Sequence, residues 1–286
     1  MRTIIVKLQG GLGNQMFQYS IGRSIANDTN SGLILDLSFL NKKGDLGYTL
    51  RDYELDVFGI DAVKQQKQRY FGHSIFSRIN TKISRIRYVG EKSFRYDPAI
   101  FSLKGNLYLD GFWQTEKYFQ QNEELIRQHL SFKAEPDDDN RRLAHLIENM
   151  PAVSLHIRRG DYVNGDVPTY HNLCTLDYYH MAIKRILTVE KNPTFFIFSD
   201  DICWTKQNLN LKFPHHFVEN NTRNNHYWDM YLMSLCKHNI IANSSFSWWG
   251  AWLNKSKQKL VIAPQKWFND PKIDTSDIVP SKWIRI

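Results

Sequence analysis

The chain alternates short apolar runs of strand length with longer stretches of helical periodicity, and this alternation restricts the fold more than any other feature. Residues 4–8 and 33–36 are predicted strands, and a predicted helix over residues 15–28 lies between them. A strand, a helix and a second strand in this order are typical of a βαβ unit with parallel strands. We therefore predict an α/β fold.

The alternation continues through the chain and is interrupted once. A strand over 106–110 and a helix over 115–130 precede the interruption at residues 135–140, where Pro136 and a run of carboxylates indicate a linker or helix start. The predicted strands after it are 153–157, 195–198, 216–218, 239–242 and 260–263, and the predicted helices are 176–190, 227–237 and 246–253. At 286 residues the chain is long enough for two domains. We expect two Rossmann-like domains facing each other across a cleft, over 1–138 and 139–286. The last residues of the second domain can pack back on the first.

Basic residues are concentrated in one segment. Residues 64–95 contain nine lysines and arginines and one acid, Glu91, and the net charge of the whole chain is +8. Every third or fourth residue from Ile75 to Ile86 is an isoleucine, a pattern typical of a basic amphipathic helix. Two interpretations stay open: contact with an anionic membrane or a lipid-linked acceptor, and an ordinary helix with a solvated basic face. No nucleic-acid-binding signature accompanies the segment, so nucleic acid is not a predicted partner.

The cysteines and the apolar runs favour a cytoplasmic protein. Cys174, Cys203 and Cys236 show no CxxC spacing, which argues against a disulfide framework or a zinc site. No apolar run approaches the eighteen residues or so of a membrane-spanning helix, and the chain begins directly with a predicted strand. Peripheral contact with the inner face of the membrane through residues 64–95 is a hypothesis.

Residues 156–162, with the sequence HIRRGDY, bring charged groups to the end of a predicted buried strand. Open α/β sheets bind ligands at the carboxyl ends of their strands. Arg158 and Arg159 suit an anionic oxygen cluster such as a diphosphate, because each guanidinium offers a planar fork of donors and stays charged. His156 and Asp161 lie beside them. A surface salt-bridge cluster is the competing interpretation.

A glycine-rich turn joins the first predicted strand to the first predicted helix. Residues 9–15, QGGLGNQ, allow backbone N–H groups, including that of Gly11, to approach an anion at the helix N-terminus. The turn lacks the last glycine of a dinucleotide motif and carries Asn14 and Gln15 instead. Their amides can bind sugar hydroxyls or phosphate. A purely structural tight turn is the alternative.

Two further motifs follow strands of the second half. Asp200 and Asp201 come after the strand 195–198, where a carboxylate can accept from a guanine edge, or alternatively cap a helix. Adjacent carboxylates are poorly placed to share a metal ion, and we predict no metal site. Residues 243–253, NSSFSWWGAWL, couple a strand end to a helix start. Their hydroxyls and N–H groups suit a phosphate cradle, and the tryptophans suit packing or sugar stacking; the cradle consists of Ser244, Ser245, Phe246 and Ser247.

Together, the segments 10–19, 156–162 and 243–253 resemble the three signatures of the glycosyltransferase family 11 α1,2-fucosyltransferases, in the same order. Residues 228–234 and 264–268 resemble bacterial members that decorate O-antigens or similar glycans. The resemblance implies a GT-B fold and inverting transfer of L-fucose from GDP-β-L-fucose to the 2-hydroxyl of a galactose-terminated glycan, which could be lipid-linked. It also implies that no metal or other cofactor is required.

The resemblance also implies individual roles. Arg158 would hold the β-phosphate and support the departing GDP, and His156 with Asp201 would contact guanine. The turn 245–247 would cradle the diphosphate, and Asn14 would lie near phosphate and fucose. Arg159 is expected to be a scaffold residue, paired for instance with Asp161.

The general base is the least determined role. Asp161 is the first choice because it lies beside the phosphate clamp, but it could equally hold Arg159 or the loop backbone. Asp166, Asp177 and Glu219 stay open, and a very dissociative transition state could need no base. Two alternatives to the main function are an inverting transferase of another nucleotide sugar and a GDP-sugar- or glycan-binding protein without turnover.

Overall fold

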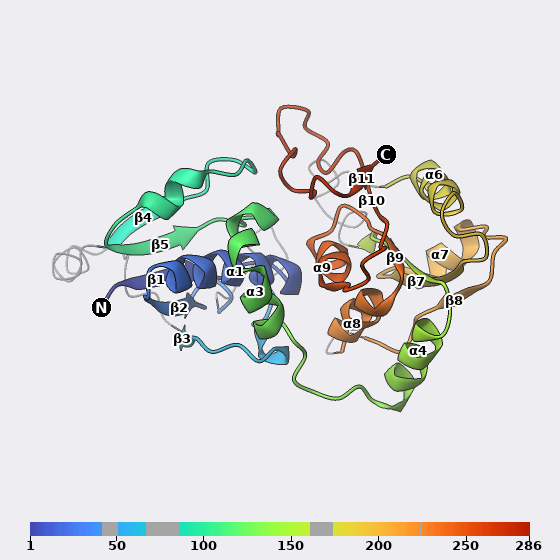
Figure 1. Ribbon diagram of the computed structural model, residues 1–286, viewed down its shortest axis with the longest axis horizontal. Coiled ribbons are helices and arrows are strands. Elements are labelled where there is room, and N and C mark those ends of the chain that lie inside the picture. Colours follow the sequence, from blue (N-terminus) through green and yellow to red (C-terminus); the bar gives the residue numbers. More distant parts are fainter. Residues whose placement is uncertain (42–50, 67–85, 161–173, 223–224) are drawn as a thin grey trace. The chain divides into compact units, whose positions relative to one another are not determined.

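The computed structural model describes residues 1–41, 51–66, 86–160, 174–222 and 225–286, which form two compact units (Figure 1). Unit 1 comprises residues 1–133 with Ser276–Ile278, and unit 2 comprises residues 134–275 with Val279–Ile286. The division predicted after residue 138 falls at the start of helix α4 (Asp138–Glu148). Asp137 caps this helix by accepting a hydrogen bond from the backbone N–H of Asn140.

Unit 1 contains a parallel five-stranded sheet in the order β3-β2-β1-β5-β4. Its strands are β1 (Thr3–Lys7), β2 (Gly32–Asp36), β3 (Val63–Gln65), β4 (Ile86–Gly90) and β5 (Asn106–Asp110). Its helices are α1 (Leu12–Asp28) and α3 (Glu123–His129), with 3-10 turns η1 (Leu55–Val57), η2 (Pro98–Ser102), η3 (Glu116–Tyr118) and η4 (Gln120–Asn122). The predicted strands at 4–8, 33–36 and 106–110 and the helix between the first two are confirmed.

The continuous helix predicted over residues 115–130 is wrong in its first half. Thr115 caps only the short turn η3, and Phe119 leaves helical geometry with φ −137° and ψ 8°. The side chains of Tyr118 and Phe119 are fully buried. Burying these two large rings favours two short 3-10 turns there, and the α-helix begins at Glu123.

Helix α1 packs closely on the sheet of unit 1 at one glycine. A Cβ atom on Gly22 would lie 2.4 Å from Cγ2 of Val6 and 2.9 Å from Cδ1 of Leu33. These residues belong to β1 and β2, so the missing side chain lets the helix axis approach both strands. The close packing holds the N-terminus of α1 near the carboxyl end of β1.

Unit 2 contains a parallel six-stranded sheet in the order β11-β10-β9-β6-β7-β8. Its strands are β6 (Ala152–Ile157), β7 (Thr194–Ser199), β8 (His215–Phe217), β9 (His238–Ile240), β10 (Val261–Ala263) and β11 (Ile284–Arg285). The helices besides α4 are α6 (Leu176–Ile186), α7 (Ile202–Asn208), α8 (Tyr227–Leu235) and α9 (Ser245–Leu253). Every helix and strand predicted from residue 153 onward is present, within a few residues at the ends.

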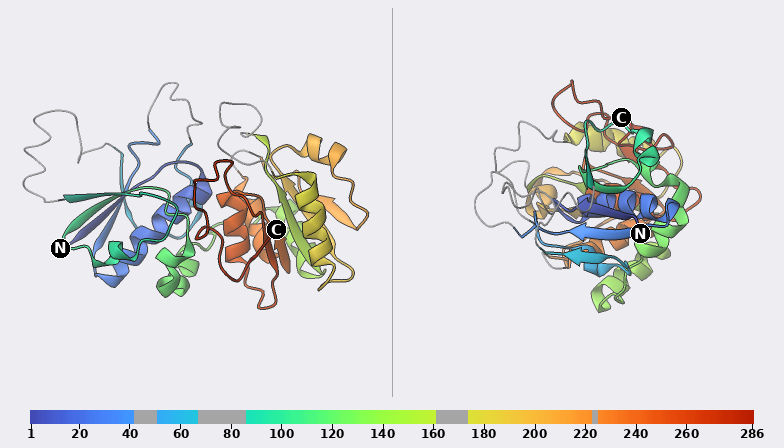
Figure 2. Two further views of the ribbon diagram at one scale, coloured as in Figure 1. Left: turned by 90° about the horizontal axis from the view of Figure 1, so that it is seen from above. Right: turned by 90° about the vertical axis from the view of Figure 1, so that its left-hand side faces the viewer.

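Helices cover both faces of this second sheet (Figure 2). Phe195 and Ile197 of β7 pack in one core cluster with α6, whereas Phe196 and Phe198 pack in another with α4 and α8. Successive strand residues point to opposite faces, so a strand covered on both faces is apolar throughout. This explains why the strands of this half are continuous apolar runs.

The order of the strands creates a switch point beside β6. The chain runs from β6 outward through β7 to β8 on one side, and β9 begins the other side next to β6. The connections on the two sides therefore diverge, and the loops after β6 and β9 separate at the carboxyl edge. Doubly wound sheets bind ligands at such a point.

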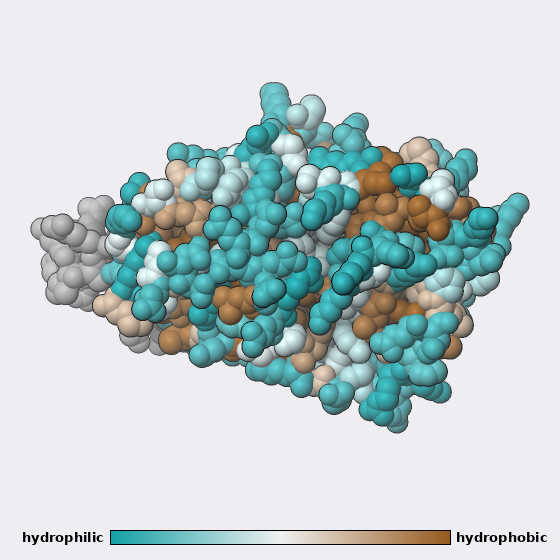
Figure 3. All heavy atoms as spheres, viewed as in Figure 1, coloured by the Kyte–Doolittle hydropathy of each residue, from teal (hydrophilic) through white to brown (hydrophobic). Residues whose placement is uncertain are grey.

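Most of the basic segment lies outside the described residues. Its described part contains β3 and β4, and the expected helical pattern does not extend to Ile86, because Ile86 starts β4 and pairs with Asn106 of β5. Among the described residues, no helix combines the length and the apolar character needed to cross a membrane. The face shown in Figure 3 is largely hydrophilic, with smaller hydrophobic areas.

Candidate nucleotide-sugar site

The carboxyl end of β6 brings His156 to the switch point of unit 2. The ring is 5% exposed, and its Nδ1 has no hydrogen-bond partner within the described structure. Burial, together with the nearby charge of Arg158, lowers the pKa of His156 to about 3. The imidazole is therefore neutral near pH 7, and it can offer a donor or an acceptor but no charge.

Asp200 at the end of β7 holds the loop that carries Arg158. Its Oδ2 lies 3.1 Å from Nε of Arg158, and its two oxygens accept from the backbone N–H groups of Arg159 at 2.8 Å and Gly160 at 2.9 Å. A Cβ atom on Gly160 would lie 2.9 Å from Oδ2 of Asp200, so glycine permits this close approach. The geometry gives Asp200 a positioning role, and direct contact with a ligand stays a prediction.

Arg159 is held by the first turn of α7. Its guanidinium carbon lies 3.5 Å from the ring centroid of Trp204, and its Nε lies 3.6 Å from Oδ2 of Asp201. Asp201 also caps α7 by accepting from the backbone N–H of Trp204 at 3.1 Å. The scaffold role expected for Arg159 thus has Trp204 and Asp201 as its described partners; Asp161 lies outside the described residues.

Helix α9 begins at the carboxyl end of the neighbouring strand, β9. Ser244 caps it by accepting from the backbone N–H of Phe246, whereas Ser247 is buried and its hydroxyl donates to the Ser244 carbonyl. Ser245 is partly exposed at the first position of the helix. The N-terminus of a helix attracts anions through its N–H groups and dipole. Of the predicted cradle, Ser245 is partly exposed, the N–H of Phe246 donates to Ser244, and Ser244 and Ser247 shape the turn; the ligand contacts of these residues stay predictions.

Three aromatic rings lie close together where β6 ends and where α8 and α9 begin. The ring of Phe246 lies 6.0 Å from that of His156 and 5.6 Å from that of His226, which precedes α8. His226 was not among the predicted residues, because no sequence motif marks it. In the next helical turn, burial raises the pKa of Asp229 to about 7, although Asn221 donates a hydrogen bond to its carboxyl.

The tryptophans of α9 serve packing. Trp248 and Trp249 are fully buried with their rings 5.0 Å apart, and Trp248 also contacts Trp283 at 5.3 Å. The sugar-stacking alternative is therefore wrong for these two residues, because no face of either ring reaches the surface.

The glycine-rich turn of unit 1 is tied to the chain itself. Gln15 is fully buried, and its amide bonds to the carbonyls of Gly10 and Asp52 and to the backbone N–H of Glu54. The Glu54 carboxylate accepts from the N–H of Leu12 at 2.6 Å, in the first turn of α1. The amide of Gln15 thus positions the turn. The N–H of Leu12, one of the groups predicted to approach an anion, already donates to the Glu54 carboxylate.

Gly11 and Asn14 remain at the surface of this turn, and both are partly exposed. The nearest side-chain atom to a Cβ on Gly11 would be Cγ of Arg51, at 4.0 Å. Asn14 Oδ1 accepts from Nε2 of Gln114 at 2.7 Å. Their predicted contacts with a ligand stay predictions.

The candidate bases differ in what the structure describes. Asp161 and Asp166 lie outside the described residues. Asp177 is exposed in the first turn of α6, and Glu219 forms an ion pair with Lys206 at 2.6 Å. The role of general base therefore stays a prediction.

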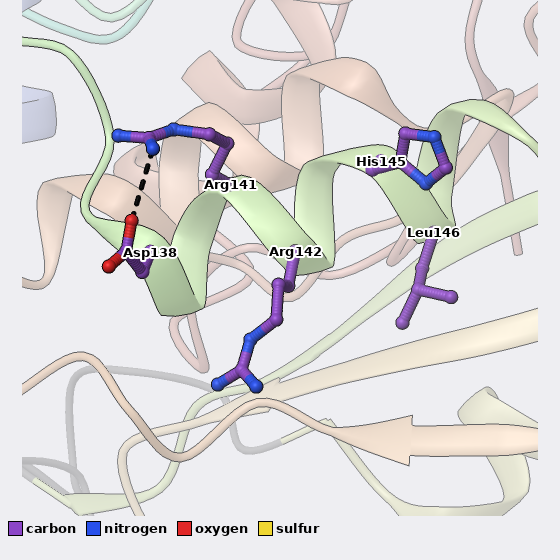
Figure 4. Close-up of a pocket in the computed structure, with 5 residues that line it drawn as sticks. All are labelled: Asp138, Arg141, Arg142, His145 and Leu146. Carbon is purple, nitrogen blue, oxygen red and sulfur yellow. Dashed lines mark hydrogen bonds and ion pairs between the residues drawn. The ribbon is translucent and has the colours of Figure 1, made fainter.

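A shallow pocket of about 570 Å³ lies along α4 (Figure 4). None of the residues that line it is a predicted site residue; they are Asp138, Arg141, Arg142, His145 and Leu146. Arg141 and Asp138 form an ion pair across one helical turn at 3.0 Å. Among the described residues, no three histidine, cysteine or carboxylate side chains are grouped to hold a metal ion.

Comparison with known proteins agrees with this arrangement. The model of the family "Glycosyl transferase family 11" matches residues 2–286. The chain is 39% identical to an alpha-1,2-colitosyltransferase of Escherichia coli, over 100% of this chain and 99% of that protein. It is 32% identical to the O-antigen biosynthesis glycosyltransferase WbnK of Escherichia coli, over 98% of this chain and 99% of that protein.

Among solved structures, the NodZ alpha-1,6-fucosyltransferase soaked with GDP-fucose aligns over 88% of this chain and 92% of its own, with a TM-score of 0.50 and 16% identity. This similarity shows the fold, which is of the GT-B type with two α/β units built on parallel sheets. The sequence signatures, the two parallel sheets and the family match over nearly the whole length agree, and the chain belongs to glycosyltransferase family 11.

Proposed function

We propose that this glycosyltransferase moves a 6-deoxy-L-hexose, L-fucose in the first instance, from its GDP-linked donor to the 2-hydroxyl of a terminal galactoside, with inversion at the transferred carbon. The observation that carries the proposal is the convergence of Arg158 and the N-terminus of α9 on the switch point of unit 2. A diphosphate leaving group needs positive charge and N–H donors at one place, and this edge of the sheet offers both.

Arg158 supplies the charge for the departing GDP in this proposal. The acceptor hydroxyl attacks from the face opposite the diphosphate, and the bond to the sugar breaks through an oxocarbenium-like state. Negative charge then develops on the β-phosphate, where a guanidinium already oriented by Asp200 needs little reorganisation. The neutral His156 and Asp201 are proposed to contact the guanine.

A proton must leave the acceptor hydroxyl during transfer. Asp161 is proposed as the base, since it directly follows the Arg158–Gly160 loop in the sequence. Replacing it by asparagine is expected to lower kcat strongly at neutral pH and to leave GDP binding intact. A kcat that is unchanged in that variant would overturn this assignment.

The donor sugar has a second candidate. The 39% identical relative is named an alpha-1,2-colitosyltransferase, and colitose is a sugar related to fucose. GDP-colitose is therefore proposed as the alternative donor to GDP-β-L-fucose. The α1,2 linkage is common to this relative and to the galactoside 2-alpha-L-fucosyltransferases matched over a third of the chain, such as SEC1 of Bos taurus.

The test is a transfer assay with purified protein. GDP-fucose, GDP-colitose and a third nucleotide sugar are each offered with galactosides that differ in the penultimate sugar, and the product linkage is assigned by NMR. We expect GDP release and an α1,2 product with one 6-deoxy donor. Transfer to another galactose hydroxyl, or tight GDP binding without transfer to any acceptor, would contradict the proposal.

We also propose that no metal ion takes part, because Arg158 and the helix N-terminus provide the electrostatic support. Activity is then expected to be the same in EDTA and in added Mg²⁺. Complete loss of activity in EDTA would refute this part of the proposal.

Contact with a membrane is proposed separately. The basic segment 64–95 could bring the enzyme to anionic lipid at the inner face of the cytoplasmic membrane, near a lipid-linked acceptor. Flotation with liposomes that contain or lack anionic lipid decides this, since equal binding to both would exclude an electrostatic contact.

A further inference from the structure

The sheet of unit 1 has its own switch point, between β1 and β5. The chain runs from β1 to β2 and β3 on one side, whereas β5 and β4 lie on the other. Two turns leave the carboxyl edge here: residues 9–11 after β1, and residues 111–114 after β5. Buried Gln18 joins them, since its Nε2 donates to the carbonyls of Gln9 and Gly111 at 3.2 Å each.

The turn after β5 is held in an unfavourable conformation. Trp113 has φ +57°, a region that bulky side chains rarely adopt. The Glu91 carboxylate accepts from the N–H groups of Phe112 at 2.7 Å and Trp113 at 3.0 Å. The Trp113 ring packs edge-on against Tyr118 with the centroids 5.5 Å apart. These contacts hold the turn in this conformation, and backbone strain of this kind clusters at active sites and ligand clamps.

The side chain that the turn aims is Gln114. It is 8% exposed, its Nε2 donates to Asn14 Oδ1 at 2.7 Å, and its Oε1 is buried without a hydrogen-bond partner in the described structure. The Oδ1 atom of Asn14 faces Gln114 and accepts its hydrogen bond. Because Oδ1 and Nδ2 lie on opposite sides of the amide, the Nδ2 donor of Asn14 points away from Gln114.

Gly10 shows where this donor lies. Gly10 has φ +75°, and a Cβ atom there would be 2.4 Å from Nδ2 of Asn14. The Asn14 amide therefore sits against the glycine-rich turn in a space that only glycine leaves open.

We infer that Gln114 is a positioning residue that fixes the orientation of the Asn14 amide, so that Asn14 presents an N–H donor to an acceptor oxygen of the bound substrate. The relevant oxygens are those of the diphosphate or of the sugar. The inference rests on the proposed function only in taking Asn14 as a substrate contact. Gln114 itself needs no contact with the substrate.

A double-mutant cycle tests the coupling. Asn14→Ala, Gln114→Met and the double variant are compared for kcat, for KM of the donor and acceptor, and for GDP-fucose and GDP binding by calorimetry. Methionine keeps the length of glutamine and removes both polar atoms. Gln120→Met, at an exposed position of η4, is the matched control and should leave every value unchanged.

We expect Gln114→Met alone to lower kcat/KM about tenfold, and to have almost no further effect once Asn14 is alanine. Equal effects of Gln114→Met in both backgrounds would overturn the inference, as would an Asn14→Ala variant with wild-type kinetics and binding. A sugar-oxygen contact alters GDP-fucose binding but not GDP binding, whereas a phosphate contact alters both.

Gln114→Glu gives a second, independent readout. A carboxylate accepts only, so Asn14 must turn its Nδ2 inward and present Oδ1 to the substrate oxygen. We expect this near-isosteric variant to lose more activity than Gln114→Met at equal thermal stability. The reverse order would overturn the inference.

The two failures are distinguishable. A wild-type protein that transfers no sugar defeats the proposed function, and the cycle can still be completed on donor binding. A wild-type protein that transfers sugar, with additive variants, defeats only the role of Gln114.

Discussion

At the level of single residues, the site depends on carboxylates that hold cations in place. Asp200 orients Arg158 and the two N–H groups after it, and Asp201 with Trp204 holds Arg159. The two adjacent arginines therefore have different surroundings: Arg159 stacks on the Trp204 ring beside Asp201, whereas Arg158 pairs with Asp200.

Replacing Arg158 by alanine is expected to lower kcat about 10²- to 10³-fold, the usual cost of removing one preorganised donor from a developing charge. Steady-state kinetics with the preferred donor measures the effect. Arg185→Ala, on the exposed surface of α6, is the control and should retain full activity. A loss below threefold in Arg158→Ala would mean that another group supports the leaving diphosphate.

Asp229 should make stability depend on pH. Its folded pKa of about 7 lies above the ordinary value of 3.8, mainly because of burial, so the unfolded chain loses this proton first as the pH rises. The wild type thus loses stability between about pH 4 and pH 7. Asp229→Asn removes this dependence, and we expect it to gain up to about 4 kcal/mol relative to wild type at pH 8 and little at pH 4.

Urea unfolding at the two pH values measures this difference. Asp177→Asn removes an exposed carboxyl in α6 and provides the comparison. If the stability difference between Asp229→Asn and wild type is the same at pH 8 and pH 4, ionisation of the Asp229 carboxyl does not destabilise the folded protein.

At the level of elements, glycines set how closely neighbours approach. Helices α8 and α9 meet at Gly250, where a Cβ atom would lie 2.9 Å from Cβ and 3.1 Å from Sδ of Met233. The Cβ of Met233 is attached directly to the backbone of α8, so it can move little to relieve the contact. The close contact sets how nearly α9 approaches α8.

Gly250→Ala is expected to reduce the free energy of unfolding by about 1–3 kcal/mol, the usual cost of overpacking. The midpoint of urea denaturation measures it. Gly59→Ala serves as the control, because a Cβ there meets nothing within 4 Å. If both variants are equally stable, the helix pair has more freedom than the contact indicates.

The elements of unit 2 were largely predictable from the sequence, and the exceptions in unit 1 arise from contacts that local spacing does not show. The apolar runs of unit 2 correspond to strands buried on both faces, a pattern that follows directly from burial. The isoleucine series ending at Ile86 was misleading, because the helical spacing continues into a residue that pairs with β5. Strand pairing is a long-range contact, and local spacing carries no information on it.

At the level of the whole molecule, the C-terminal segment is divided between the two units. Ser276–Ile278 belongs to unit 1, whereas the following residues return to unit 2 and end in β11. Asp277 is 8% exposed and accepts from the N–H of Tyr96 at 2.8 Å, with Nε of Arg95 at 3.2 Å and Nζ of Lys117 also paired to it.

Asp277→Asn is expected to lower the free energy of unfolding by about 1–2 kcal/mol at pH 7, because the ion pairs of the buried carboxylate with two half-exposed cations and its charge-assisted hydrogen bonds are weakened. Burial opposes ionisation of Asp277, but the bonds from Lys117 and Tyr96 and the charge of Arg95 outweigh it, and the pKa is lowered. The contribution is therefore complete above about pH 4 and is lost as the pH falls further.

Thermal unfolding at pH 7 and pH 3 measures the change, with the exposed Asp270→Asn variant as the control. The difference between wild type and Asp277→Asn should shrink at pH 3. A difference that grows on acidification would mean that the carboxyl is not stabilised in its charged form.

By itself, the sequence determined the α/β class, most elements of unit 2 and the positions of the polar turns, because periodicity and turn residues act over a few neighbours. Only the tertiary structure decided which groups meet. Asp200 lies 41 residues from the N–H of Arg159 that it holds, and Gln114 lies 100 residues from Asn14. Such pairs depend on the order of strands in each sheet, which arises from packing of the whole unit, and no local pattern encodes it.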